Sequence, residues 1–409
     1  MKKAVAKTPT NVYNNTQKTV INTQKGGCCI MSFDQIIIWV MAFGALIGAL
    51  DRIFGNKLGL GEKFEEGFNA MGPLALGMVG IITLAPVIAR ALGPVIIPVF
   101  DLVGADPAMF ASILANDMGG YPLAMELAAN EEAGLLSGLV VASMLGCTLV
   151  FSIPVGLGLI EYEDRPFFAK GLLAGLTTIP VGGLIGGLIA GFDIGLIFVN
   201  LIPVLVLSIL LIIGLIISPD ILIKGALGFG RLILIVITIG LGASAFEFMT
   251  GIVLIPGMAP IMDGIEIIGY IGIVLLGTFP ILHLLVKGLE KPLNKLGKKL
   301  GMNATGAAGI VITMANSIPV YKMMKDMDNR GKIINTAWLV PATAALGDHL
   351  GFTAGVRPDM ITPVVISKIA AGILAIGVAY WVSRDHSSVE RQRKNKEIAE
   401  EKTDETVVS

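Results

Sequence analysis

Apolar residues occur in long blocks along this chain of 409 residues. Most blocks are about 20 residues long, and a helix of that length rises about 30 Å, which matches the hydrocarbon core of a bilayer. The chain is therefore predicted to be an all-α polytopic membrane protein. We place nine full transmembrane helices at about residues 33–50, 70–92, 133–160, 168–190, 194–217, 227–249, 265–287, 333–352 and 361–382.

Two further apolar segments are interrupted by residues that break helices. One runs from Asp106 to Leu127 and is broken at 119–122, and the other runs from Thr305 to Met327 and is broken around 316–319. Each could cross the bilayer once, or enter and leave on the same side as a re-entrant hairpin. Acidic residues flank the first segment and basic residues flank the second, which favours two hairpins on opposite sides. The alternative is eleven transmembrane helices with parallel repeats.

The two broken segments belong to two similar halves of the sequence. Residues 115–118 (ANDM) and 315–318 (ANSI) lie two hundred positions apart, and Tyr121 matches Tyr321. Five predicted spans separate the corresponding elements, and an odd number inverts the second half relative to the first. The sequence therefore predicts two inverted repeats, at about 33–190 and 227–383, as in many secondary transporters. Other matched pairs are Gly72 with Gly269 and Gly104 with Gly301.

Composition supports the membrane assignment, because 54% of the residues are hydrophobic and only 15% are charged. Such a chain has too little polar surface for a soluble protein of this size. Residues 1–30 are polar and are predicted to be a disordered extension, and Met31 is an alternative start directly before the first span. Residues 31–383 form the predicted transporter domain. Residues 384–409 are predicted to be a charged cytoplasmic tail.

Polar residues within the apolar blocks are the candidates for chemistry, because an intramembrane carboxylate costs a few kcal/mol or more and is usually kept for a substrate or ion. Asp117 and Asp348 are such carboxylates. A broken helix also frees backbone groups at membrane depth, where they become ligand contacts if they face a cavity. The predicted substrate-binding residues are Asn116, Asp117, Tyr121, Asn316, Ser317, Tyr321, Asp348 and His349.

Some of these residues have a simpler structural reading. Asp348 could cap a helix end, and His349 could be a satisfied interior side chain. Tyr121 and Tyr321 could be interfacial tyrosines, which are common in membrane proteins. In a functional reading, neutral His349 could accept a hydrogen bond or take a proton.

Other functional classes are less well supported by the sequence. The chain has three histidines, no HExxH motif and no nucleophile elbow, so an intramembrane enzyme is the weaker hypothesis. Its three cysteines form no metal-ligand pattern, and no metal or other cofactor is predicted. Nucleic acid is not an expected partner. An ion-coupled carrier of another small polar solute, such as a nucleoside or amino acid, is the main alternative, and a homo-oligomer stays open.

The sequences ANDMGGYPLA at 115–124 and GDHLGFTAG at 347–355 together resemble the bacterial EutH family of ethanolamine utilisation proteins. The resemblance extends from about Met31 to the last span. It implies an ethanolamine permease of the bacterial inner membrane, with a functional link to the enzymes of the ethanolamine microcompartment. Ethanolamine is mostly a cation at neutral pH, which suits Asp117 or Asp348 as the partner of its ammonium group and asparagine as the partner of its hydroxyl.

Overall fold

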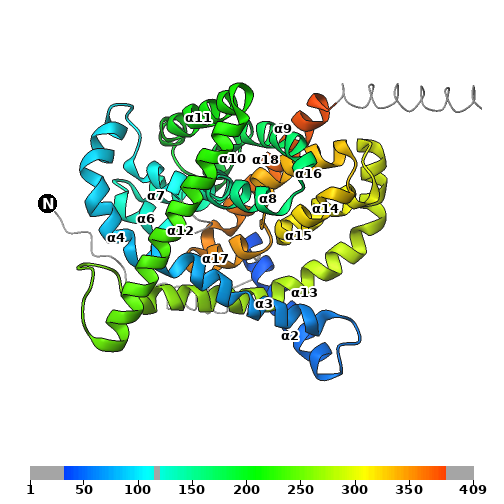
Figure 1. Cartoon of the computed structure of the whole chain (residues 1–409). Coiled ribbons are helices and arrows are strands. Elements are labelled where there is room, and N and C mark those ends of the chain that lie inside the picture. The colour runs from blue at the N-terminus through cyan, green and yellow to red at the C-terminus, as the bar shows by residue number, and fades with distance from the viewer. Residues whose placement is uncertain (1–31, 115–119, 384–409) are drawn as a thin grey trace, which may run out of the picture.

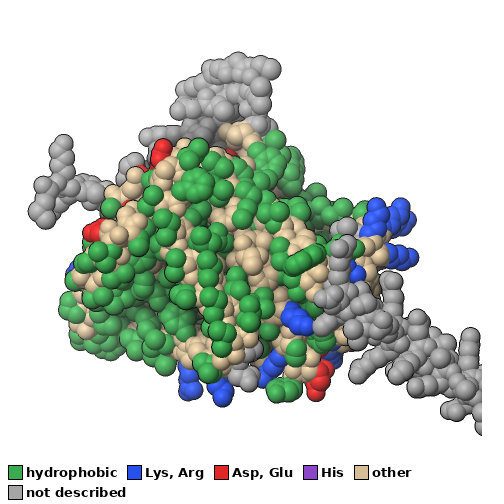
Figure 2. Space-filling view, turned by 90° about the horizontal axis from the view of Figure 1, so that it is seen from above, with side chains coloured by type: hydrophobic (Ala, Val, Ile, Leu, Met, Phe, Trp, Pro, Cys, Tyr) green, Lys and Arg blue, Asp and Glu red, His purple; other side chains and the backbone are tan. Residues whose placement is uncertain are grey.

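The computed structural model describes residues 32–114 and 120–383, and within these ranges every regular element is a helix. The predicted all-α polytopic class is confirmed, because eight helices are long and apolar enough to cross a membrane. Hydrophobic side chains cover most of the face seen in Figure 2, while Lys and Arg side chains gather at its margins. The eight helices are Phe33–Ile53, Leu60–Asp101, Glu131–Leu159, Tyr162–Ala190, Ile194–Ile217, Lys224–Thr250, Ile261–Leu289 and Pro358–Val382.

The first half of the chain (Figure 1) begins with two long helices, continues through the first broken segment and ends with two further spans. Its helices are α2 (Phe33–Ile53), α3 (Leu60–Asn69), α4 (Met71–Asp101), the 3-10 turn η2 (Pro107–Phe110), α5 (Ala111–Leu114), α6 (Gly120–Leu127), α7 (Glu131–Leu135), the π-helices η4 (Leu136–Gly146) and η5 (Thr148–Ser152), α8 (Ile153–Leu159), η6 (Tyr162–Asp164), α9 (Arg165–Leu176) and α10 (Ile179–Ala190).

The second half repeats much of this order after one additional span, α11 (Ile194–Ile217). Its other helices are α12 (Pro219–Thr250), α13 (Ile261–Leu300), α14 (Ala304–Ala315), α15 (Ile318–Met323), η7 (Met324–Asp326), α16 (Asn329–Ala342), α17 (Asp348–Val356), η8 (Pro358–Met360) and α18 (Ile361–Val382).

Most of the helices pack into two groups. The frame consists of α2, α3, α4, α12 and α13, in which α13 lies against α2, α3 and α4, and α12 lies against α4. The hairpin core contains the two broken segments, the helix from α7 to α8, and α9, α10, α16, α17 and α18. The span from Glu131 to Leu159 is almost entirely buried and forms the centre of the hairpin core. The frame meets the hairpin core where α13 packs against α14 and α17, and where α4 packs against α6.

Two close helix crossings in the frame have the same construction. In the first, α2 meets α13, and a Cβ atom at Gly44 or Gly277 would overlap the backbone of the opposite helix. In the second, α12 meets α4, and a Cβ atom at Gly240 or Gly80 would do the same. Glycine allows helix backbones to touch in this way inside a membrane. Because Gly44 corresponds to Gly240 and Gly80 to Gly277 in the predicted repeats, each half supplies one helix to each crossing.

A third matched pair stands before the two broken segments. Gly104 follows the end of α4 with φ of 70°, and Gly301 follows α13 with φ of 72°. This left-handed conformation suits glycine and commonly ends a helix. The turn that precedes the broken segment therefore has the same backbone conformation in both halves.

Both broken segments return to their starting points. The carboxylate of Asp106 accepts hydrogen bonds from the backbone N–H groups of Ala129 at 3.1 Å and Asn130 at 2.9 Å. In the second segment, the backbone N–H of Asn303 donates to the Asp328 carboxylate at 2.9 Å. We call residues 106–130 the first hairpin and residues 303–328 the second hairpin.

The two hairpins open at opposite ends of α18. Near the start of α18, Arg357 forms an ion pair with Glu131 at 2.8 Å, next to the end of the first hairpin. Near the end of α18, the guanidinium of Arg330 lies over the ring of Tyr380 at 4.1 Å, next to the end of the second hairpin. Accordingly, α6 and α7 lie at the left of Figure 1 and α14 lies at the right, with α17 and α18 between them.

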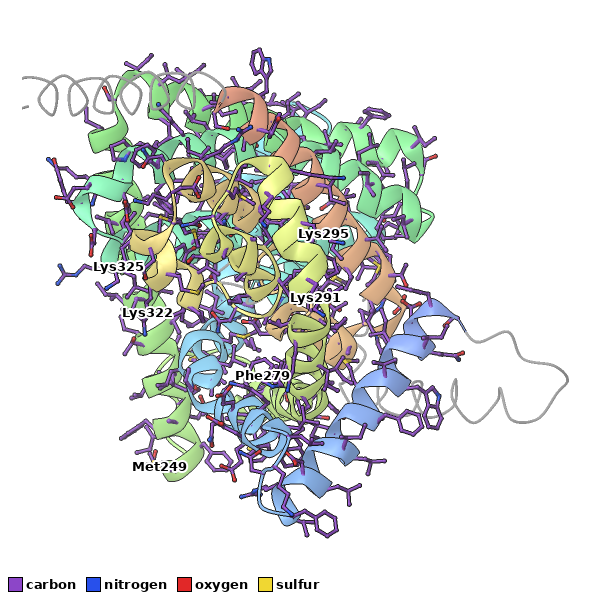
Figure 3. All side chains as sticks on the ribbon, turned by 90° about the vertical axis from the view of Figure 1, so that its right-hand side faces the viewer. Met249, Phe279, Lys291, Lys295, Lys322 and Lys325 are labelled. Carbon is purple, nitrogen blue, oxygen red and sulfur yellow. The ribbon has the colours of Figure 1, made fainter. Side chains whose placement is uncertain are left out.

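The end of the molecule at the second hairpin is basic. Figure 3 looks onto this end, where Lys291 and Lys295 of α13 appear together with Lys322 and Lys325 of the second hairpin. All four side chains are exposed. Basic residues of this kind mark the cytoplasmic side of a membrane protein.

The span predicted at 333–352 is not one continuous helix. Helix α16 ends at Ala342, one residue after Pro341, and the chain unwinds until α17 begins at Asp348. Thr343 is extended, and Ala344 has a left-handed φ of 52°. Unwinding is tolerated because the second hairpin supplies acceptors. The backbone N–H of Ala344 donates to the carbonyl of Thr313, and that of Leu346 donates to the carbonyl of Met314, both at 2.9 Å.

Candidate substrate-binding site

The tip of the second hairpin is built by Asn316 and the residues that follow it. Helix α14 ends at Ala315, and Asn316 adopts an extended conformation with φ of −161° and ψ of 137°. Its side-chain oxygen accepts a hydrogen bond from the backbone N–H of Ile318 at 2.8 Å, which starts α15. Pro319 occupies the first turn of α15, where its missing N–H does no harm. Asn316 is exposed although it lies at the tip of a hairpin, whereas Ser317 is buried.

The unwound segment between α16 and α17 lies directly against this tip. Besides the two backbone hydrogen bonds to Thr313 and Met314, Gly347 is so close to α14 that a Cβ atom there would overlap the carbonyl oxygen of Ala315. The segment therefore packs Gly347, which precedes Asp348, against Ala315, which precedes Asn316 and Ser317. Three of the residue types predicted for the site, a carboxylate, an amide and a hydroxyl, come from two broken elements that touch each other.

Asp348 and His349 begin α17. Asp348 is partly buried and lies in the first turn of the helix, where its negative charge is favoured by the unpaired N–H groups. One carboxylate oxygen accepts a hydrogen bond from the backbone N–H of His349 at 3.2 Å. The His349 side chain is fully buried. Its ring is near enough to Asp348 and to Lys368 of α18 to interact with both charges.

Lys368 is a residue of this site that the sequence reasoning missed. Its side chain is fully buried, and the ammonium nitrogen donates to the backbone carbonyl of Ser143 at 2.6 Å. Ser143 belongs to the π-helix η4, a helix type that often occurs at functional sites. A signal was available, because Lys368 is the only charged residue between positions 361 and 382. Asp348 was selected because an ionisable residue within an apolar span is costly and usually functional, and the same argument applies to Lys368.

Tyr321 lies on the side of the second hairpin that faces η5 and α9. Its ring packs edge-on against Phe168, with the ring centres 6.1 Å apart. Its hydroxyl faces those of Ser152 and Ser317. Among the described residues, however, neither the Tyr321 hydroxyl nor that of Ser152 meets the geometry of a hydrogen bond, although both are buried. Two buried hydroxyls without partners are uncommon and suit contact with a polar ligand.

Tyr121 occupies a different environment near the start of α6. Its ring packs edge-on against Phe352 of α17 at 5.9 Å between ring centres. Its hydroxyl lies near Arg357, which pairs with Glu131 and Asp359. The pKa of Arg357 is raised, chiefly by its hydrogen bonds to Asp359, so it stays charged. Tyr121 is therefore close to α17 but has different neighbours from Tyr321.

Asn116 and Asp117 lie outside the described residues, so their predicted contribution stays a prediction. A separate hollow of about 420 Å³ lies at the end of the first hairpin, where its lining includes Asp101, Asp106 and Asn200. It contains none of the predicted site residues. The candidate site therefore rests on the second hairpin, the start of α17 and Lys368.

Comparison with known proteins identifies the family. The sequence profile described as "Ethanolamine utilisation protein, EutH" matches residues 33–382. The chain is 53% identical to the "Probable ethanolamine permease EutH" of Listeria monocytogenes, covering 86% of this chain and 95% of the relative. It is 47% identical to the Escherichia coli protein of the same name, covering 85% and 95%, and 46% identical to the "Uncharacterized protein YxeR" of Bacillus subtilis, covering 89% and 98%. No solved structure matches the chain.

The profile covers all eight spans, and the relatives are aligned over nearly their whole length. The resemblance seen at 115–124 and 347–355 thus extends through the whole membrane domain. The chain is a multi-pass protein of the bacterial inner membrane and belongs to the EutH family of ethanolamine utilisation proteins.

Proposed function

We propose that this protein carries ethanolamine across the bacterial inner membrane by alternating access at a site between its two halves. The observation that carries the proposal is the high identity, over nearly full length, to relatives named as probable ethanolamine permeases. Permeases are transporters rather than enzymes. In this proposal the protein supplies substrate to the enzymes of the ethanolamine microcompartment.

The proposed architecture is a pair of inverted repeats, about 33–190 and 227–383, with nine crossings and two re-entrant hairpins. The broken helix from α16 to α17 is the ninth crossing, in addition to the eight apolar spans given above. The reciprocal glycine crossings of the frame and the opposite openings of the hairpins support inversion, because a two-fold axis in the membrane plane relates such elements. The lysines around the second hairpin support a cytoplasmic position for that end.

The proposed substrate contacts follow from the chemistry of ethanolammonium, which has a cation at one end and a hydroxyl at the other. Asp348 receives the ammonium group through charge-assisted hydrogen bonds. Asn316 and Ser317 bind the hydroxyl from the facing hairpin tip. The side chain of Asn316 is exposed, and that of Asp348 is only partly buried. This exposure supports access of the substrate to both residues.

The remaining predicted residues have secondary parts in the proposal. His349 helps to position Asp348 through its backbone N–H, which donates to the Asp348 carboxylate. Tyr321 offers a buried hydroxyl that has no hydrogen-bond partner among residues 32–114 and 120–383. Asn116, Asp117 and Tyr121 contribute from the first hairpin.

Uptake into proteoliposomes tests the function. Purified protein should accumulate labelled ethanolamine in a saturable manner, and unlabelled ethanolamine should compete at similar concentrations. Nucleosides and amino acids should not compete, whereas competition by either class would favour the alternative carrier. An Asp348→Asn variant that transports normally at limiting substrate would contradict the proposed site.

A further inference from the structure

Ser152 carries a fully buried hydroxyl group near the centre of the hairpin core, at the end of the π-helix η5. Most buried serine and threonine side chains of this chain donate to a backbone carbonyl three or four residues earlier, as Thr148 does to Met144 at 2.6 Å. The Ser152 hydroxyl has no hydrogen-bond partner within residues 32–114 and 120–383. Such a group is rare in a folded protein, which points to a partner other than these residues.

The corresponding residue of the second half is bonded differently. Residues 145–152 (LGCTLVFS) match residues 346–353 (LGDHLGFT), so the counterpart of Ser152 is Thr353. The Thr353 hydroxyl is also buried, but it donates to the carbonyl of His349 at 2.8 Å. Both halves therefore have a buried hydroxyl at this position, and only that of Thr353 is satisfied within the described parts of the chain.

A second hydroxyl without a partner, that of Tyr321, lies against the same helix face. Gly156 follows Ser152 by four residues, so both lie on one face of the helix. A Cβ atom at Gly156 would lie 3.1 Å from the Cε1 atom of the Tyr321 ring. Tyr321 therefore packs against the face that carries Ser152, and its hydroxyl faces those of Ser152 and Ser317. Three buried hydroxyl groups thus converge between η5 and the second hairpin.

The chemistry of these groups indicates what they can bind. Serine and tyrosine hydroxyls each donate one hydrogen bond and can accept others. A ligand hydroxyl both donates and accepts, so it can pair with either of them. An ammonium group only donates, and it would leave the protons of both side chains unpaired. The hydroxyl cluster therefore suits the alcohol end of a substrate rather than its cationic end.

We propose that Ser152 and Tyr321 form the subsite that recognises the hydroxyl group of the substrate, so that Ser152 determines specificity for an amino alcohol over a simple amine. This inference rests on the proposed function as an ethanolamine carrier. It adds a residue of η5 to the proposed contact of the hydroxyl with Ser317. An analogue without the hydroxyl leaves buried polar side chains unpaired, and sites that bind in this way discriminate strongly against such analogues.

Uptake of two labelled amines into proteoliposomes tests the proposal. Ethanolamine and ethylamine are both mostly protonated at pH 7, and ethylamine lacks the hydroxyl group. For the wild type, kcat/KM should be higher for ethanolamine than for ethylamine. Ser152→Ala should lower kcat/KM for ethanolamine about fivefold and leave that for ethylamine within about twofold of the wild type. Tyr321→Phe should change the two values in the same way.

Ser208→Ala is the matched control. Ser208 is also buried, and its hydroxyl likewise has no hydrogen-bond partner among the residues that the structure describes, but it belongs to α11 and not to the candidate site. Its replacement should change kcat/KM for neither amine. Both amines should be measured on one preparation of each variant, because a structural defect would lower both values together.

The outcomes separate this proposal from the proposed function. If the wild type transports ethanolamine but does not prefer it to ethylamine, the role of Ser152 is overturned and the proposed function stands. The same conclusion follows if Ser152→Ala keeps the wild-type ratio of the two kcat/KM values. Tyr321→Phe provides the same test if the Ser152→Ala protein does not fold. If the wild type transports no ethanolamine, the proposed function fails, and the role of Ser152 fails with it.

Discussion

Gly44 of α2 and Gly277 of α13 lie so close together that a side chain at either position would overlap the backbone of the other helix. The same relationship joins Gly240 of α12 to Gly80 of α4. Each residue of one pair corresponds to a residue of the other in the two halves of the sequence. The crossings therefore fix the frame at two equivalent points, and the following prediction tests their importance.

Alanine at Gly80 or Gly277 should destabilise the protein. The added methyl group has no room at either crossing, and overpacking of this kind costs about 1–3 kcal/mol. Thermal unfolding of the detergent-purified variants should show a lower midpoint. Gly72→Ala and Gly269→Ala are matched controls, because these corresponding glycines have open space at Cβ. Their midpoints should be unchanged or slightly higher. Equal effects in all four variants would contradict the reciprocal crossings.

The two hairpins should be accessible from opposite sides of the membrane. A variant without native cysteines would carry single cysteines at Asp106, Glu131, Lys298 or Lys325. An impermeant thiol reagent added outside intact cells should label the first two positions, because the first hairpin has acidic flanks and the second has basic flanks. The last two should react only in inverted vesicles. If the two flanks of the same hairpin reacted from opposite sides of the membrane, the result would instead support eleven crossings.

Asp348→Asn should impair uptake while leaving the protein in the membrane. Loss of a charge-assisted contact in a dry site costs about 2–3 kcal/mol, which corresponds to about a 30- to 150-fold weaker apparent affinity. Initial rates of labelled ethanolamine uptake over a concentration series would measure the change. Asp359→Asn is a suitable control, because that carboxylate is exposed and pairs with Arg357 outside the site. Its uptake should resemble the wild type.

Tyr321→Phe should weaken uptake without lowering stability. The hydroxyl is buried and has no hydrogen-bond partner among the described residues, so its removal leaves no new unsatisfied group. If the substrate uses this hydroxyl, its loss should weaken apparent affinity about fivefold, the equivalent of about 1 kcal/mol. Uptake and thermal unfolding should be measured on the same preparation. A stable variant with wild-type uptake would show that Tyr321 only packs against Phe168.

Gly347→Ala should disturb the backbone that positions the candidate site. A methyl group at Gly347 would overlap the carbonyl oxygen of Ala315, so either the hairpin tip or the start of α17 must shift. Uptake should fall although no substrate-binding side chain has changed. Gly377→Ala, in the open environment of α18, should transport normally. Retained uptake in Gly347→Ala would mean that the contact between hairpin and α17 is not needed in its present form.

Sequence patterns were sufficient for the all-helical membrane class and for eight of the nine predicted spans, because length and apolarity are local properties. They were not sufficient for the break at 343–347. That segment lacks the asparagine seen at 316, and it unwinds because Thr313 and Met314 offer carbonyl groups from a distant helix. Hydrogen-bond acceptors that come from another helix cannot be recognised in the sequence of the segment that donates to them.

The candidate site was predicted in part for a similar reason. Asp348 and His349 were selected as ionisable residues within an apolar block, whereas Lys368 was not selected. The hydrogen bond from its ammonium group reaches the carbonyl of Ser143, which is 225 positions away in the sequence. The residues at the helix breaks could be predicted from their residue types. The position of Lys368 follows from the packing of α18 against α17 and η4, which is a tertiary contact.

The backbone hydrogen bonds from Ala344 and Leu346 to the second hairpin limit how that hairpin can open. Lifting the tip away on its own would strand two N–H donors in the membrane interior, at a cost of a few kcal/mol. The tip, the unwound segment and the first turn of α17 should therefore move together as one rigid unit. A rearrangement of the second hairpin that keeps these two hydrogen bonds must therefore carry the break between α16 and α17 along with the hairpin tip.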